Sequence, residues 1–140
     1  MGVQKDKLTQ EQKQELERLR NFVSRNGLST QMNGTKWRKA IDAILAIPGY
    51  TPSFRTKLIT DAAEPPENVW NLFFPAQIPL YNSIEWFELN SKTGPAPTGP
   101  GKDRRPDFAE ALRSALAEAG IPMAESRTGV RIVGYSKPRR

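Results

Sequence analysis

The first hydrophobic pattern in the chain is a narrow stripe typical of an amphipathic helix. Thr9 followed three residues later by Gln12 forms a capping box, which predicts a helix start at this point. The apolar residues that follow at helical spacing are Leu16, Leu19, Phe22 and Val23. Gly27 is placed to end the helix. We expect the stripe to pack at the edge of the core, and the alternative is an arm that docks on a partner or a second copy.

Two more helices follow from the same spacing. Asn33 or Thr35 caps the second one, and Pro48 with Gly49 ends it. Its apolar face consists of Trp37, Ile41, Ile44 and Leu45. The last helix begins near Pro106 and ends at Gly120. Its apolar face consists of Phe108, Leu112, Ala115, Leu116 and Ala119.

Between the second and last helices the pattern changes to one that favours strands. Residues 54–60 alternate partly, residues 69–74 form an apolar run closed by a proline, and residues 83–89 give the clearest alternation. In that last stretch alternation places Glu85 and Glu88 on opposite faces. Residues 129–135 predict a further strand near the end of the chain.

The predicted order of elements is therefore α-α-β-β-β-α-β. Strands grouped before a helix, without regular βαβ alternation, favour an α+β fold. We expect a mixed or largely antiparallel sheet of about four strands, with helices packed on one face. Residues 1–32 read as a helical extension, residues 33–135 as a single α+β domain and residues 136–140 as a basic tail.

A proline- and glycine-rich stretch, residues 91–106, interrupts that domain and predicts a flexible basic loop. Lys102, Arg104 and Arg105 in this loop could contact phosphate or an acidic surface, but a solvated loop is the simpler interpretation. No apolar run approaches the roughly 18 residues that cross a bilayer. The first residues are charged rather than leader-like, so we expect a cytoplasmic protein without a membrane partner.

Composition narrows the possible chemistry, because the 140 residues include no cysteine and no histidine. Disulfides, thiolate nucleophiles, cysteine-ligated zinc and the usual histidine base are therefore excluded. We expect a non-catalytic protein with no cofactor and no metal. An enzyme that uses carboxylates alone, or a magnesium site at Asp61, Glu64 and Glu67, remains an alternative.

The distribution of charge points to a binding surface. The net charge is +6, yet residues 58–91 hold five acidic residues and no Lys or Arg. Half of the chain's aromatic residues lie in this acidic stretch, namely Trp70, Phe73, Phe74, Tyr81, Trp86 and Phe87. Aromatic side chains with nearby carboxylates suit a basic protein partner. A nucleic-acid partner is the second hypothesis, which the positive net charge permits. It ranks lower because stacking platforms combine aromatic and basic residues, and these are separated here.

We therefore select partner-binding candidates from the acidic stretch and from the strand before it. The first choices are Trp70, Tyr81, Glu85, Trp86 and Glu88. Arg55 and Lys57 are the second choice, for a partner with an acidic site. Packing in the core is the competing interpretation for Trp70, Tyr81 and Trp86.

Several short stretches, taken in order, resemble an uncharacterised family of small bacterial proteins that open with Asn-x-Thr-Lys-Trp. The stretches begin at residues 33–37 and continue at 52–57, 83–88, 120–122 and 129–135. The resemblance covers about residues 33–90 and 106–135 and implies no established activity. By size and type such proteins are similar to bacterial immunity proteins. This similarity implies a protein that neutralises a cognate toxin, for example a basic nuclease, by stoichiometric binding.

Overall fold

A computed structural model describes residues 9–67, 69–72, 74–93 and 98–137. Helix α1 spans Gln10–Arg25 and begins at the predicted capping box. The Thr9 hydroxyl oxygen accepts from the Gln12 backbone N–H at 3.1 Å, and the Gln12 side chain accepts from the Thr9 N–H at 2.9 Å. Gly27 follows with φ of 63°, the left-handed conformation that ends many helices.

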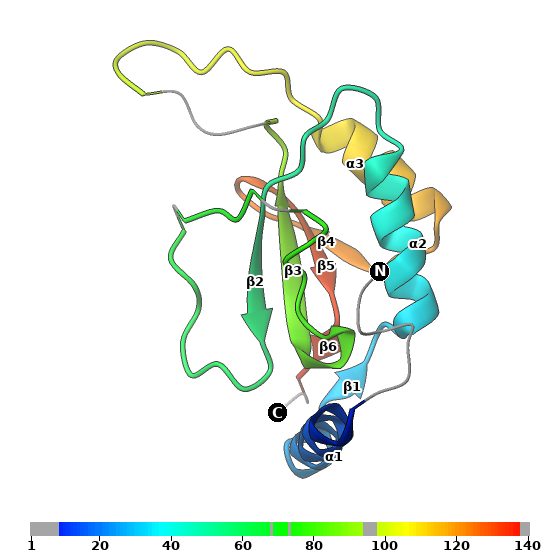
Figure 1. Ribbon diagram of the computed structural model, residues 1–140. Coiled ribbons are helices and arrows are strands. Elements are labelled where there is room, and N and C mark those ends of the chain that lie inside the picture. The colour runs from blue at the N-terminus through cyan, green and yellow to red at the C-terminus, as the bar shows by residue number, and fades with distance from the viewer. Residues whose placement is uncertain (1–8, 68, 73, 94–97, 138–140) are drawn as a thin grey trace.

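Two helices, α2 and α3, lie side by side on one face of the sheet (Figure 1). Helix α2 spans Gly34–Leu45, and Asn33 caps it by accepting from the Lys36 N–H at 2.8 Å. Helix α3 spans Ala109–Glu118. Helix α1 lies apart from this pair, near a 3₁₀ turn, η1, at Tyr81–Ser83. Only Leu19 of its apolar stripe is fully buried, which agrees with packing at the edge of the fold.

The main sheet is antiparallel throughout and has the spatial order β2-β3-β5-β4. The strands are β2 at Phe54–Leu58, β3 at Ile84–Asn90, β4 at Met123–Glu125 and β5 at Gly129–Val133. A small second sheet pairs β1, Ser29–Thr30, with β6, Tyr135–Ser136. Strand β2 is thus at one edge of the main sheet, which matters for the site described below.

The predicted α+β class and element order, with helices on one face of a four-stranded sheet, are confirmed. The structure adds detail to the apolar run that begins at Val69. Among its described residues only Asn71 pairs, through a bridge to Phe54, and the fourth strand of the sheet is β4. Among the described residues, no helix is both long enough and apolar enough to span a membrane.

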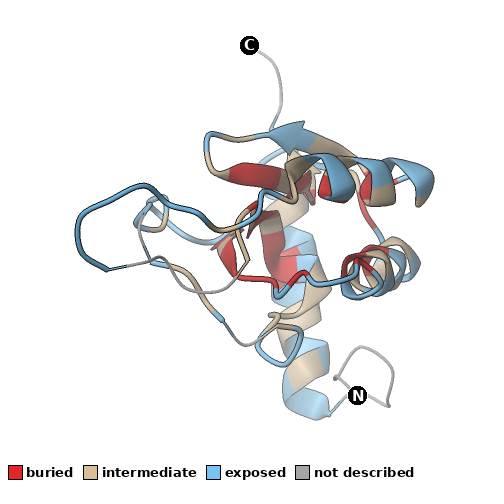
Figure 2. Ribbon diagram, turned by 90° about the horizontal axis from the view of Figure 1, so that it is seen from above, coloured by how far each residue is buried: buried red, intermediate tan, exposed pale blue. Residues whose placement is uncertain are grey.

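The hydrophobic core fills the space between the sheet and the helix pair α2 and α3 (Figure 2). Phe87 is at its centre, stacked on Phe54 with ring centroids 4.7 Å apart and meeting Trp37 edge-on at 6.1 Å. Leu112 of α3 and Ile132 of β5 are buried beside them. One face of the sheet is therefore closed by apolar packing, and the other face needs a different cover.

Candidate functional site

The second face of the sheet carries charged residues that the fold buries. The register places Arg55 of β2, Glu88 of β3 and Arg131 of β5 in one row across three strands. An Arg55 Nη atom lies 2.5 Å from a Glu88 carboxylate oxygen, and an Arg131 Nη atom lies 3.2 Å from the same oxygen. The Arg55 and Glu88 side chains are only 6% and 2% exposed. Such a pair must compensate its own desolvation through close hydrogen bonds.

Several hydrogen bonds offset the desolvation of Glu88. Burial alone would raise the pKa of its carboxyl, but hydrogen bonds from Ser126, Arg55, Thr128 and Arg131 lower the pKa to about 2. The Thr128 hydroxyl donates to its second oxygen at 2.8 Å. Glu88 is therefore a fixed negative charge inside the fold.

A second buried ion pair lies on the same face, further along β2. The Lys57 ammonium is 2.6 Å from a Glu85 oxygen, and both side chains are largely buried. The pairing of β2 with β3 shifts after Lys57, so that Leu58 faces Ile84 and Glu85 is left as an extra residue in β3. Simple alternation had placed Glu85 opposite to Glu88. That prediction is wrong, because the irregular pairing brings Glu85 to the face that Lys57 and Glu88 share.

Two tryptophan rings hold the Arg55 guanidinium. Its central carbon lies 5.3 Å from the Trp70 ring centroid and 5.4 Å from that of Trp86. Arg131 stacks on Trp86 at 3.7 Å. These distances are within the range of cation–π attraction. Trp86 is 5% exposed and Trp70 is half-buried, so the outer ring of the pair is the accessible one.

Residues 59–67 and 69–72, which we call the covering segment, run over this face of the sheet (Figure 1). An Arg55 Nη atom donates to the carbonyl oxygens of Pro65 and Pro66, at 3.1 and 2.8 Å. The bridge between Asn71 and Phe54 fixes the far end of the segment to the edge of β2. The middle of the segment is therefore held by a buried charged side chain.

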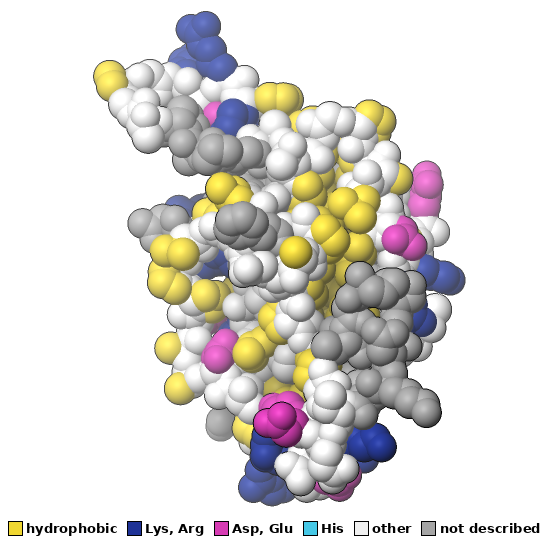
Figure 3. Space-filling model, viewed as in Figure 1, with side chains coloured by type: hydrophobic (Ala, Val, Ile, Leu, Met, Phe, Trp, Pro, Cys, Tyr) yellow, Lys and Arg dark blue, Asp and Glu magenta, His cyan; other side chains and the backbone are white. Residues whose placement is uncertain are grey.

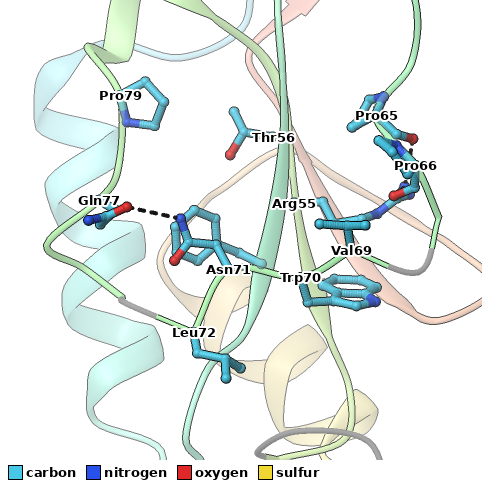
Figure 4. Close-up of a pocket in the computed structure, with 11 residues that line it drawn as sticks. Arg55, Thr56, Pro65, Pro66, Val69, Trp70, Asn71, Leu72, Gln77 and Pro79 are labelled. Carbon is cyan, nitrogen blue, oxygen red and sulfur yellow. Dashed lines mark hydrogen bonds between the residues drawn. The ribbon is translucent and has the colours of Figure 1, made fainter.

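A groove with a volume of about 540 Å³ lies where the covering segment meets the edge of β2 (Figure 4). It is lined by Phe54, Arg55, Thr56, Pro65, Pro66, Val69, Trp70, Asn71, Leu72, Gln77 and Pro79. Figure 4 shows β2 passing between two walls, with Trp70 and Val69 on one side and Gln77 and Pro79 on the other. Concave, mostly apolar surfaces with a few polar groups are typical of binding sites.

Exposed apolar side chains line the groove, and exposed acidic side chains belong to the same covering segment. Val69 is 61% exposed and Leu72 is 45% exposed, two of the three large hydrophobic residues that stand out as exposed among the described residues. Figure 3 shows hydrophobic atoms at the surface on the side where the covering segment runs. Asp61, Glu64 and Glu67 of the same segment are exposed as well. Sequence reasoning missed Val69 and Leu72, although an apolar pair beside a proline turn was a visible signal.

The seven predicted partner-binding residues divide into three groups. Trp70 and Arg55 line the groove, where Arg55 is buried and Trp70 is half-buried. Glu85, Trp86, Glu88 and Lys57 belong to the buried charged face beneath it. Tyr81 lies elsewhere, stacked on Trp37 at 5.8 Å between the ring centroids and packed against the hydrophobic core. Trp70 is therefore the more accessible of the two groove residues, and the buried residues hold the surface in place.

The carboxylates proposed as a magnesium site do not gather. Among the residues that the structure describes, no group of three or more acidic side chains is placed to hold a metal ion. Asp61 instead accepts from the Leu58 N–H at 2.9 Å, and Glu67 pairs with Arg127. Asp61 and Glu67 therefore each have a local partner, whereas Glu64 is simply exposed.

These features define a small α+β protein with a buried charged sheet face and an accessible groove at its edge strand. The chain belongs to a family of unknown function, DUF6678, whose model matches residues 19–139. The predicted membership of an uncharacterised family is therefore confirmed. The match begins within α1 and includes both regions that carried the resemblance. No curated protein and no solved structure matches the chain.

Proposed function

We propose that this protein acts by binding another protein and that it is a bacterial immunity protein which neutralises a cognate toxin. The observation that carries the proposal is the groove at β2 with Val69, Trp70 and Leu72 around it. Exposed apolar side chains beside an aromatic residue are typical of the anchor points of protein interfaces. The immunity role itself rests on the similarity in size and type to such proteins.

Charge supports a basic partner. The covering segment presents Asp61, Glu64 and Glu67 near the groove, and residues 58–91 contain no Lys or Arg. Carboxylates at the rim of an interface accelerate association with a basic surface and set its orientation. A basic nuclease is one toxin that would present such a surface.

Rigidity supports the same proposal. The covering segment lacks helix and strand, yet Arg55 joins it to Glu88 through hydrogen bonds and to Trp70 through ring contact. A surface that is held in its binding conformation loses less entropy on association. Burying charged residues beneath an irregular segment costs desolvation free energy. A role in positioning a binding surface would explain why the fold retains them.

The test uses the full chain together with the product of the neighbouring gene, in co-purification and in survival on co-expression. Leu72→Asp should weaken the complex at least about tenfold, because it places a charge at an apolar contact. Leu45→Asp is the matched control, since Leu45 is 52% exposed on α2, away from the groove, and Leu72 is 45% exposed. Wild type and the control should both protect. If neither forms a complex nor protects, the proposal is wrong.

The loop before α3 favours a second candidate, a nucleic-acid partner. Residues 98–106 extend away from the sheet, and Lys102 and Arg104 in this loop are exposed (Figure 1). Binding to phosphate must strengthen as salt is lowered, because counterions are released. Duplex and single-stranded DNA titrations at low and high salt decide the matter. Affinity that rises as salt falls supports this candidate, and no binding at low salt removes it.

A further inference from the structure

The outer edge of β2 is only partly occupied. At one end Phe54 exchanges two backbone hydrogen bonds with Asn71, at 2.9 and 2.8 Å. At the other end the Leu58 N–H donates to the Asp61 carboxylate at 2.9 Å. Edge strands expose backbone groups that can pair with another chain, and proteins normally block them. Here the blocks stand at the two ends of β2 and leave its middle open.

Thr56 is the residue at the open position. In an antiparallel pair the backbone groups of successive residues point alternately toward the partner strand and away from it. Since those of Phe54 point away from β3 to Asn71, those of Thr56 point away as well. No hydrogen bond joins them to another described segment. The Thr56 hydroxyl oxygen is also buried without a partner among the described residues.

The groove surrounds this open position. Thr56 is one of its lining residues, and Figure 4 shows it between the wall that carries Val69 and Trp70 and the wall that carries Pro79. An extended segment that pairs with Thr56 would point alternate side chains toward these walls. The apolar character of Trp70 and Pro79 suits aliphatic side chains there.

Charge indicates which residues of the partner would lie beside the aliphatic side chain in the groove. Asp61 and Glu64 are exposed in the covering segment, and Glu67 is exposed although it pairs with Arg127. Residues 58–91 supply no positive charge of their own. Lys or Arg beside the aliphatic side chain would therefore find opposite charge, whereas acidic residues would be repelled.

We infer that the edge of β2 at Thr56 receives an extended, basic segment of the protein partner as an added strand. Backbone hydrogen bonds to Thr56 would provide affinity, the groove would take one aliphatic side chain, and the carboxylates of the covering segment would select flanking Lys or Arg. This inference rests on the proposed function and specifies how the partner is recognised.

The probe is a blocked heptapeptide of alternating Lys and Val, compared with one in which Glu replaces every Lys. Amide hydrogen exchange of the full chain is the residue-specific readout. In the free chain the Thr56 amide should exchange faster than those of Arg55 and Lys57, which face β3. Saturating Lys–Val peptide should slow Thr56 exchange at least about tenfold. The Glu–Val peptide should bind at least about fivefold more weakly.

Substitution of Thr56 separates backbone pairing from side-chain contact. Thr56→Pro removes the outward N–H, and proline is tolerated on the open side of an edge strand. It should weaken Lys–Val peptide binding at least about tenfold, whereas Thr56→Ala should change it less than about twofold. If Thr56→Pro does not fold, Glu64→Lys is the second variant, and it should reduce the preference for the Lys–Val peptide. Unchanged exchange at Thr56, or equal affinity for both peptides, overturns the inference.

The same variants separate this inference from the proposed function. A neighbouring-gene product that binds Thr56→Pro as tightly as wild type overturns strand addition and leaves the protein-binding function intact. A product that fails to bind wild type overturns the proposed function, and the peptide titration still decides whether the edge of β2 accepts a basic strand.

Discussion

The two faces of one sheet are closed in different ways. On the helix side, Phe87, Leu112 and Ile132 are almost fully buried among other apolar residues. On the opposite side Arg55 and Glu88 are also buried, but beneath a segment without helix or strand. Apolar packing adapts to many partners, whereas a buried ion pair demands specific geometry. The helix side therefore supplies stability, and the charged side supplies a defined surface.

This contrast explains why the groove lies where it does. Helices α2 and α3 cover their face with continuous side-chain contacts. The covering segment is held instead by separate polar contacts, among them those of Arg55 and the Asn71 bridge. Between these points it leaves the edge of β2 accessible.

The largest effect should come from the helix side. Phe87→Ala should lower the free energy of unfolding by about 3–5 kcal/mol, because it leaves a cavity among Phe54, Trp37 and Phe74. Urea denaturation followed by tryptophan fluorescence measures the change. A loss below about 1 kcal/mol would show that this face is loosely packed and would remove the contrast between the two faces.

The buried charge should produce an effect that depends on pH. The folded pKa of Glu88 is about 2, below its ordinary value of 4.5, so folding favours the ionised carboxylate. Its contribution is complete above about pH 4.5 and disappears as the pH falls through about 2. Glu88→Gln should therefore cost about 3 kcal/mol at pH 7 and much less near pH 2.

Unfolding experiments at a series of pH values test this directly. Glu125→Gln is the matched control, because the Glu125 side chain is 75% exposed and its ion pair with Arg113 is long, at 3.8 Å. The control should lie within about 0.5 kcal/mol of wild type at pH 7. Equal costs for the two variants at pH 7 would contradict a structural role for the Glu88 network.

Much of the fold was predictable from local signals. Helix signals lie within a few residues of one another in the sequence, so the helices were placed correctly. Examples are the capping residues Thr9 and Asn33 and the apolar spacing of α2 and α3. The apolar run at Val69 has the composition of a strand, yet its described part contributes only the bridge at Asn71. Long-range pairing, rather than local propensity, decides which apolar stretches become strands.

The candidate site was harder to predict for the same reason. Alternation on β2 identifies Arg55 and Lys57 as one face, but a row of cations normally faces water. They are buried because the register places Glu88 and Glu85 across from them, and no local pattern contains that register. The extra residue at Glu85 reversed its predicted face. The open edge at Thr56 likewise depends on where Asn71, which is distant in the sequence, pairs with β2.

The smallest effect on stability should come from the groove wall. Trp70→Ala removes the outer ring from Arg55, but Arg55 keeps Glu88 and the inner ring of Trp86. The cost should be about 1 kcal/mol, as for a partly exposed cation–π contact. Trp86→Ala should cost about 3 kcal/mol or more, because that ring is buried and holds two arginines. Urea denaturation of both variants tests the difference. Equal costs would make Trp70 part of the structural core, whereas a small cost at Trp70 with loss of partner binding identifies it as an anchor of the interface.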